Sequence, residues 1–160
     1  MAHILFVDDE IVEPRLDDDP DSDKFYGYMA YYLDELRRKN YVVSECRGVD
    51  DALEKLEKRS DYDVAIIDVM MDPGTAFAEA DTVNGMRTGV FLAKHINVNW
   101  PHIKLILLSN AVSSRPGTPG ITTYQELLDT KVCERILFKL DQTPTDLVDS
   151  VQDVLQLKGG

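Results

Sequence analysis

The chain has 160 residues, 44% of them hydrophobic, which is enough for one domain with a full core and argues against wholesale disorder. Its 29 acidic and 17 basic residues give a net charge of −12, and so acidic a surface disfavours nucleic acid and anionic lipid as partners. Two cysteines, Cys46 and Cys133, are too few for a disulfide-dense secreted scaffold, and neither a signal peptide nor a membrane-spanning apolar run is present, so we expect a cytoplasmic protein.

Short, continuous apolar runs recur along the chain, at residues 4–7, 41–43, 64–67, 105–108 and 136–138. Continuous rather than alternating hydrophobicity is typical of parallel strands that are covered on both faces. Between these runs the apolar spacing lengthens to that of helices, in residues 25–36, 49–56, 89–96, 123–128 and 147–155. The alternation of strand and helix predicts an α/β fold with a five-stranded, doubly wound parallel sheet.

Two of the expected helices carry start signals. Thr123 and Glu126 have the spacing of a capping box ahead of two leucines, and Pro144 directly after Thr143 suits the first position of the last helix. We therefore expect helices to begin near Thr123 and at Pro144.

Three connections are long, at residues 10–23, 72–88 and 110–122, and each follows the carboxyl end of an expected strand. Loops of this length in compact α/β domains are either functional lids or disordered insertions. No interdomain linker is visible, so we expect one domain over residues 1–160.

Polar residues stand where the expected strands end. Asp8 and Asp9 follow the first strand, Asp68 the third, Ser109 the fourth and Lys139 the fifth. Because the carboxyl ends of parallel strands share one edge of a sheet, these side chains can converge.

Such a group of residues suits phosphoryl chemistry on a carboxylate. Crowded carboxylates repel one another unless a cation relieves the repulsion, and Mg²⁺ typically binds one or two of them together with waters. A carboxylate beside the cation can attack phosphorus and form an acyl phosphate. Lys139 and Ser109 supply the positive charge and the hydroxyl donor that the phosphoryl oxygens need.

Four motifs carry a resemblance to a known family: Phe6-Val7-Asp8-Asp9-Glu10, Ile66-Ile67-Asp68-Val69-Met70-Met71, Leu107-Leu108-Ser109-Asn110-Ala111 and Phe138-Lys139. With them the chain resembles the receiver domain of bacterial two-component response regulators, the family of the chemotaxis regulator. The resemblance covers the chain apart from the three long loops and implies the flavodoxin-like (βα)5 receiver fold.

The resemblance also implies roles for single residues. Asp8 and Asp9 would bind Mg²⁺ together with Asp68 and the backbone carbonyl of Met70. Asp68 would accept a phosphoryl group from a histidine kinase or a histidine phosphotransfer protein, with the Ser109 hydroxyl and Lys139 contacting that group. Such a protein signals to an output partner by a conformational change and is not an enzyme beyond its own phosphorylation and dephosphorylation.

The chain departs from the family pattern at three positions. Leu140 follows Lys139 where the family usually has proline, and Asp72 stands before Pro73, where the family has methionine directly before the proline. Ile136 occupies the place of the usual aromatic residue three positions before the lysine.

Other functions remain open at this point. A flavodoxin-like FMN carrier would share the fold, but acids after the first strand would repel its phosphate. An aspartate-nucleophile phosphatase usually has a second aspartate where this chain has Met70. A pseudo-receiver that binds partners without phosphorylation would not need Asp8, Asp9, Asp68 and Lys139.

Overall fold

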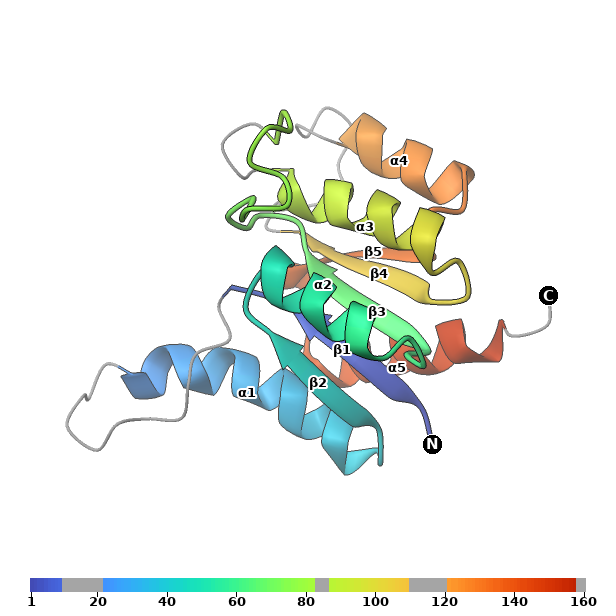
Figure 1. Ribbon diagram of the computed structural model, residues 1–160. Coiled ribbons are helices and arrows are strands. Elements are labelled where there is room, and N and C mark those ends of the chain that lie inside the picture. Colours follow the sequence, from blue (N-terminus) through green and yellow to red (C-terminus); the bar gives the residue numbers. More distant parts are fainter. Residues whose placement is uncertain (10–21, 83–86, 110–120, 158–160) are drawn as a thin grey trace.

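The computed structural model describes residues 1–9, 22–82, 87–109 and 121–157, with the backbone alone described for residues 22–28, 121–123 and 140. Its five parallel strands form one sheet in the order β2-β1-β3-β4-β5 (Figure 1). The strands are β1 (His3–Val7), β2 (Val42–Cys46), β3 (Val64–Asp68), β4 (Lys104–Ser109) and β5 (Arg135–Phe138). This topology confirms the predicted five-stranded, doubly wound sheet and the flavodoxin-like fold.

Within the described residues, four α-helices connect successive strands and a fifth follows β5, and together they cover both faces of the sheet (Figure 1). They are α1 (Ser22–Arg38), α2 (Val49–Lys58), α3 (Thr88–Asn99), α4 (Ile121–Asp129) and α5 (Pro144–Gln156), and a short 3₁₀ turn, η1 (Lys139–Asp141), precedes α5. No helix within the described residues is long and apolar enough to cross a membrane.

The apolar strands divide their side chains between two cores. On β1, Leu5 and Val7 point to the core beneath α2, α3 and α4, whereas Ile4 and Phe6 point to the core beneath α1 and α5. Side chains alternate between the faces of a strand, so a strand buried on both sides must be apolar at every position. The continuous apolar runs of the sequence therefore mark the inner strands correctly.

The edge strand β2 extends further than the apolar run predicted. It continues through Ser44 and Glu45 to Cys46, and every residue from Val42 onwards is in register with β1. Backbone pairing needs no apolar side chain, and an edge strand is only partly covered, so polar residues do not end it.

Of the two predicted helix starts, one is confirmed. Thr143 caps α5, where its hydroxyl accepts a hydrogen bond from the Asp146 N–H and the Asp146 carboxylate accepts one from the Thr143 N–H, with Pro144 in the first turn. The start near Thr123 is two residues late, because α4 begins at Ile121 and Thr123 therefore lies inside its first turn.

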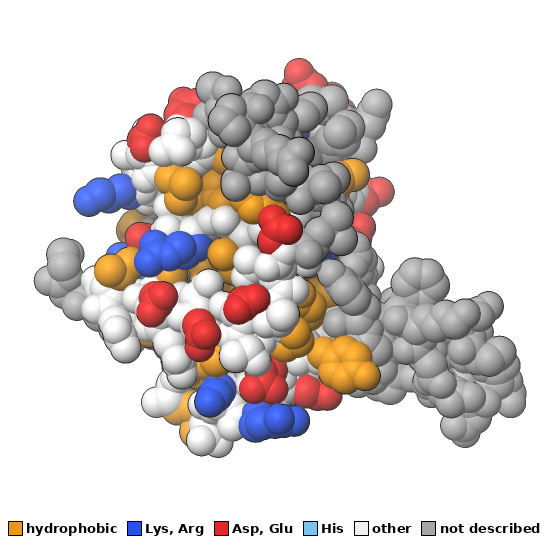
Figure 2. Space-filling model, turned by 180° about the vertical axis from the view of Figure 1, so that it is seen from behind, with side chains coloured by type: hydrophobic (Ala, Val, Ile, Leu, Met, Phe, Trp, Pro, Cys, Tyr) orange, Lys and Arg blue, Asp and Glu red, His pale blue; other side chains and the backbone are white. Residues whose placement is uncertain are grey.

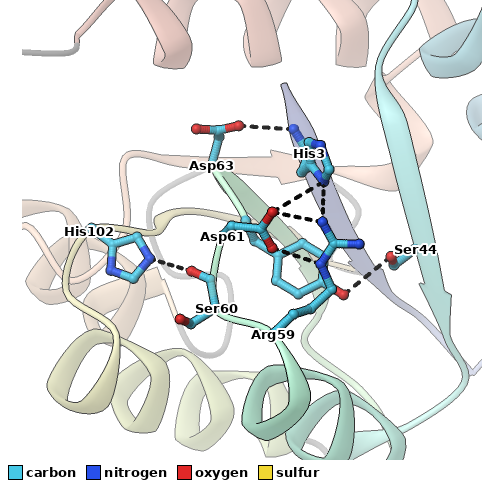
Figure 3. Close-up of polar contacts among 8 residues, drawn as sticks. His3, Ser44, Arg59, Ser60, Asp61, Asp63 and His102 are labelled. Carbon is cyan, nitrogen blue, oxygen red and sulfur yellow. Dashed lines mark hydrogen bonds and ion pairs between the residues drawn. The ribbon is translucent and has the colours of Figure 1, made fainter. Parts of the chain in front are cut away.

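At the amino edge of the sheet a set of charged residues joins β1 to the segment before β3 (Figure 3). The Arg59 guanidinium donates to both carboxylate oxygens of Asp61 at 2.7 Å and lies 2.8 Å from His3 Nδ1. The Asp63 carboxylate accepts a hydrogen bond of 2.9 Å from the His3 N–H. These contacts satisfy groups at the strand ends and lie at the edge opposite the predicted site.

The surface seen in Figure 2 carries interspersed acidic and basic side chains, with apolar side chains between them. Tyr31 on α1 is an exposed large apolar residue, with 69% of its surface accessible. An exposed tyrosine of this kind is a common anchor at protein interfaces.

Both cysteines are buried and free, and burial raises the pKa of each thiol to about 12. We expect Ellman's reagent at pH 8 to react with the native protein at least about tenfold more slowly than with the protein in urea. The ordinary thiol value is 9.0, so above it the unfolded state releases protons that the folded state keeps until about 12. The cysteines therefore make the free energy of unfolding fall as the pH rises through this interval. Equal thiol reactivity in both states would contradict the burial.

Candidate functional site

The predicted site residues meet at the carboxyl edge of the sheet. The β1–β3 register pairs Val7 with Ile67, so Asp8 and Asp68, one position further on, come side by side. The ladder of hydrogen bonds continues past the strands, because the Asp8 N–H donates to the Cys46 carbonyl at 2.9 Å. The apolar strands thus carry their terminal carboxylates into the interior.

Three carboxylates form one cluster. One carboxylate oxygen from each of Asp8, Asp9 and Asp68 lies within 4.8 Å of the other two. Asp8 and Asp68 have no accessible surface, whereas Asp9 is exposed and faces the solvent. Oxygen donors at this spacing, with one side open for water, are what Mg²⁺ prefers. The residues present therefore fit the metal that the sequence predicted.

Lys139 completes the group from the far end of the sheet. Its ammonium nitrogen lies 3.0 Å from Asp8 Oδ2 and 3.3 Å from Asp68 Oδ1, and only 5% of its side chain is accessible. A lysine is rarely buried to this extent without partners. Lys139 therefore partly neutralises the two buried carboxylates.

The charges around Asp68 and its burial shift the pKa of its carboxyl group. Burial, and next to it the Asp8 charge, raise the pKa of Asp68 to about 8, while Lys139 acts in the opposite direction and Asp9 adds to the rise. Both carboxylate oxygens of Asp68 are buried, and neither accepts a hydrogen bond from the described residues. One lysine does not offset three carboxylates, and a divalent cation would relieve the excess negative charge.

The backbone around Asp68 is closely packed against α3. A Cβ atom on Gly89 would lie 2.2 Å from the Asp68 carbonyl oxygen and 2.6 Å from Val69 Cα. The Gly89 N–H donates to the Val69 carbonyl at 2.9 Å, so the start of α3 is joined directly to the segment that carries Asp68.

Gly89→Ala should therefore displace the Asp68 backbone and lower the free energy of unfolding by about 1–3 kcal/mol. Gly48→Ala is the matched control, because nothing lies within 4 Å of its added methyl group. Urea unfolding of the two variants checks the difference. Equal stability of both variants would show that α3 can move away from Asp68 without cost.

Met70 lies two residues after Asp68, at the start of the long loop, with 40% of its surface accessible between buried Val69 and Met71. The role of its carbonyl as a metal ligand stays a prediction.

Asp50 on α2 holds the same loop further along. Its carboxylate accepts hydrogen bonds from the N–H groups of Thr75 at 2.8 Å and Ala76 at 3.1 Å, and these bonds lower the pKa of Asp50. Gly74 adopts a φ of +62° beside this carboxylate. The loop is therefore tied to α2 on the side of the sheet that carries α3.

Ser109 ends β4 with 2% of its surface accessible, and its hydroxyl lies 3.1 Å from the hydroxyl of Tyr124 on α4. The sequence did not predict Tyr124 as a site residue, because an aromatic residue at helical spacing is usually part of the core. Ile136, at the family's aromatic position, is partly buried on β5. The Leu140 side chain, residues 110–120 and residues 10–21 lie outside what the structure describes.

Comparisons with solved structures identify the fold. The chain superposes on a CheY-like response regulator receiver domain protein from Methanospirillum hungatei with a TM-score of 0.64 and 17% identity, covering 98% of this chain and 94% of that one. A receiver domain protein from Clostridium thermocellum gives a TM-score of 0.66 at 18% identity, covering 99% and 97%.

The response regulator TrrA from Thermotoga maritima, solved in complex with Mg²⁺ and beryllofluoride, gives a TM-score of 0.60 at 21% identity, covering 96% of this chain and 99% of that one. No family model and no curated protein matches the chain. The resemblance to receiver domains is thus confirmed as one of fold across nearly the whole chain.

Proposed function

We propose that the chain is a response regulator receiver of a two-component system, in which Asp68 takes a phosphoryl group from a histidine kinase or a histidine phosphotransfer protein. The observation that carries the proposal is the buried Asp68 carboxylate, clustered with Asp8 and Asp9 and 3.3 Å from the Lys139 ammonium. The receiver fold supports the same assignment. In this proposal residues 1–160 act as one receiver domain in the cytoplasm.

The chemistry follows from these residues. An Asp68 carboxylate oxygen attacks the phosphorus of a phosphohistidine, the new P–O bond forms, and the P–N bond breaks as the imidazole leaves with the bonding pair. Mg²⁺, held by Asp8, Asp9, Asp68 and the Met70 carbonyl, would neutralise charge on the phosphoryl oxygens. Lys139 pairs with one phosphoryl oxygen, and the Ser109 hydroxyl donates a hydrogen bond to another.

Incubation with acetyl phosphate tests the proposal without knowledge of the partner. With Mg²⁺ present, we expect intact mass to rise by one phosphate, and we expect no rise when EDTA removes the metal. Labelling that does not depend on Mg²⁺ would contradict the proposed site.

Asp8→Asn and Asp9→Asn should each weaken Mg²⁺ binding, by about 10- to 100-fold in dissociation constant, because each removes a charged ligand. Asp8→Asn also removes one of two buried like charges, so its metal-free form should be as stable as the wild type or more so. Asp72→Asn is a matched control on an exposed aspartate near the site. Unchanged metal affinity in both site variants would remove Asp8 and Asp9 from the site.

The partner would dock on α1 in this proposal, with exposed Tyr31 as an anchor. Tyr26, which also lies on α1, has no described side chain. Tyr31→Ala should slow transfer from the phosphodonor protein and spare labelling by acetyl phosphate.

Two other functions are tested by the same preparation. An aspartate-nucleophile phosphatase would hydrolyse small phosphate esters with turnover, whereas we expect at most one phosphate bound per chain. A phosphorylation-independent pseudo-receiver would not be labelled at all. The buried Asp68–Lys139 pair favours the phosphoacceptor over both.

A further inference from the structure

Lys139 stands just beyond the last strand of the sheet. The β4–β5 register ends with Ser109 opposite Phe138, so Lys139 lies past the last paired position. It opens the 3₁₀ turn η1, which the Gln142 N–H closes with a distance of 3.5 Å to the Lys139 carbonyl oxygen. This distance is long for a hydrogen bond, and no proline within η1 fixes a φ angle. The turn by itself therefore places Lys139 only loosely.

A side chain from α1 reaches this turn. The Tyr32 hydroxyl donates a hydrogen bond of 3.0 Å to the Gln142 carbonyl, between residues 110 positions apart in the sequence. Tyr32 is 6% exposed, so little water competes for the bond. Within the part of the chain that the structure describes, this is the hydrogen bond by which Gln142 reaches beyond its own turn. The turn after β5 is therefore tied to α1.

The same contact brings Tyr32 close to the lysine. Tyr32, Lys139 and Gln142 line one small pocket, together with Met29 and Leu108. Tyr32 also belongs to the core beneath α1 and α5, so its ring is held by apolar packing. A hydroxyl on a ring that is packed in this way is a rigid anchor for the turn.

Lys139 is thus held at both ends. The carboxylates of Asp8 and Asp68 hold its ammonium, at 3.0 Å and 3.3 Å, and the turn holds its backbone. Mg²⁺ on the same carboxylates would neutralise them and repel the ammonium, so the ionic hold weakens when the proposed site is filled. The stem of a lysine is flexible, and with the ionic hold weakened the place of the ammonium depends on the backbone.

We infer that Tyr32 is a positioning residue for Lys139, because its bond to the Gln142 carbonyl fixes the turn after β5 and keeps the ammonium beside Asp68 when Mg²⁺ is bound. The inference rests on the proposed function and deepens it, since it names a residue on α1 on which the action of Lys139 depends. Tyr32 acts through the backbone of the turn, to which its hydroxyl is bonded.

Tyr32→Phe removes the hydroxyl and keeps the ring. With the turn released, the ammonium withdraws more easily as Mg²⁺ enters, so calorimetric titration should show Mg²⁺ binding about two- to tenfold more tightly, the range that one hydrogen bond supports. Labelling of Asp68 by acetyl phosphate at saturating Mg²⁺ should become slower by a similar factor, because the ammonium is less often beside the phosphoryl group. The two changes favour opposite outcomes, whereas general damage to the fold would weaken metal binding and slow labelling together.

Tyr62→Phe is the matched control. Tyr62 is 2% exposed and its hydroxyl donates to Ser44 Oγ at 3.2 Å, so this variant also loses the hydrogen bond of a buried tyrosine. Tyr62 precedes β3, at the edge of the sheet opposite Asp68. We expect the control to bind Mg²⁺ and to be labelled as the wild type is.

The outcomes separate this inference from the proposed function. If the wild type binds Mg²⁺ and is labelled, but Tyr32→Phe gives the wild-type values or the same changes as Tyr62→Phe, the inference is wrong and the proposed function stands. Slower labelling without a gain in metal affinity would give Tyr32 a structural role alone and would also overturn the inference. If the wild type is not labelled at all, the proposed function fails and the inference fails with it.

Discussion

Asp68→Asn should abolish labelling by acetyl phosphate, because the amide cannot attack phosphorus as a carboxylate does. The Asp68 carboxylate is fully buried, lies 3.3 Å from the Lys139 ammonium and is clustered with the carboxylates of Asp8 and Asp9. Intact mass after incubation with acetyl phosphate and Mg²⁺ gives the result directly. Modification of the variant to the wild-type extent would assign the phosphoryl group to another residue.

Loss of labelling must be separated from loss of fold. Removing one of two buried like charges should leave the metal-free variant as stable as the wild type or more stable, so its circular dichroism and unfolding midpoint should not fall. Asp72→Asn, an exposed aspartate on the loop after Asp68, is the matched control and should be labelled normally.

Lys139→Met should lower the free energy of unfolding by about 3–5 kcal/mol in the absence of Mg²⁺, since it leaves two buried carboxylates without their cation. The lysine nitrogen is 3.0 Å from Asp8 and 3.3 Å from Asp68, and both carboxylates are inaccessible to water. Urea unfolding compared with Lys94→Met, at an exposed lysine on α3, measures the effect. A loss no larger than in Lys94→Met would show that the contacts of Lys139 with Asp8 and Asp68 contribute little to stability.

The size of this loss should depend on pH and on metal. Burial and the Asp8 charge already raise the pKa of Asp68, and removing Lys139 raises it further. A carboxyl group whose pKa is higher in the folded than in the unfolded state lowers the free energy of unfolding as the pH rises from the unfolded pKa of about 4 through the folded pKa. The variant should therefore lose more stability at pH 8 than at pH 5. Mg²⁺ should restore part of the stability, because it binds the folded site and neutralises the carboxylates.

Much of the fold and of the candidate site was determined by the sequence alone. A strand buried on both faces has to be apolar at every position, so the runs near Ile4, Val64 and Leu105 could mark the inner strands of a parallel sheet. Parallel strands end at one edge, and this brings Asp8 and Asp68 together from positions 60 residues apart in the sequence. For these residues, the order of strands and helices was sufficient to predict that their side chains meet.

Helix packing decided the rest, because apolar periodicity shows which face of a helix is buried but not what lies against it. The Gly89 contact with the Asp68 backbone depends on where α3 sits over β3. The bond between Tyr124 and Ser109 depends on how closely α4 approaches the end of β4. The hydrogen bond from the Thr75 N–H to the Asp50 carboxylate depends on where α2 packs on the sheet. Each of these contacts joins elements whose separation is set by the volumes of the side chains packed between them, and only the tertiary structure contains that information.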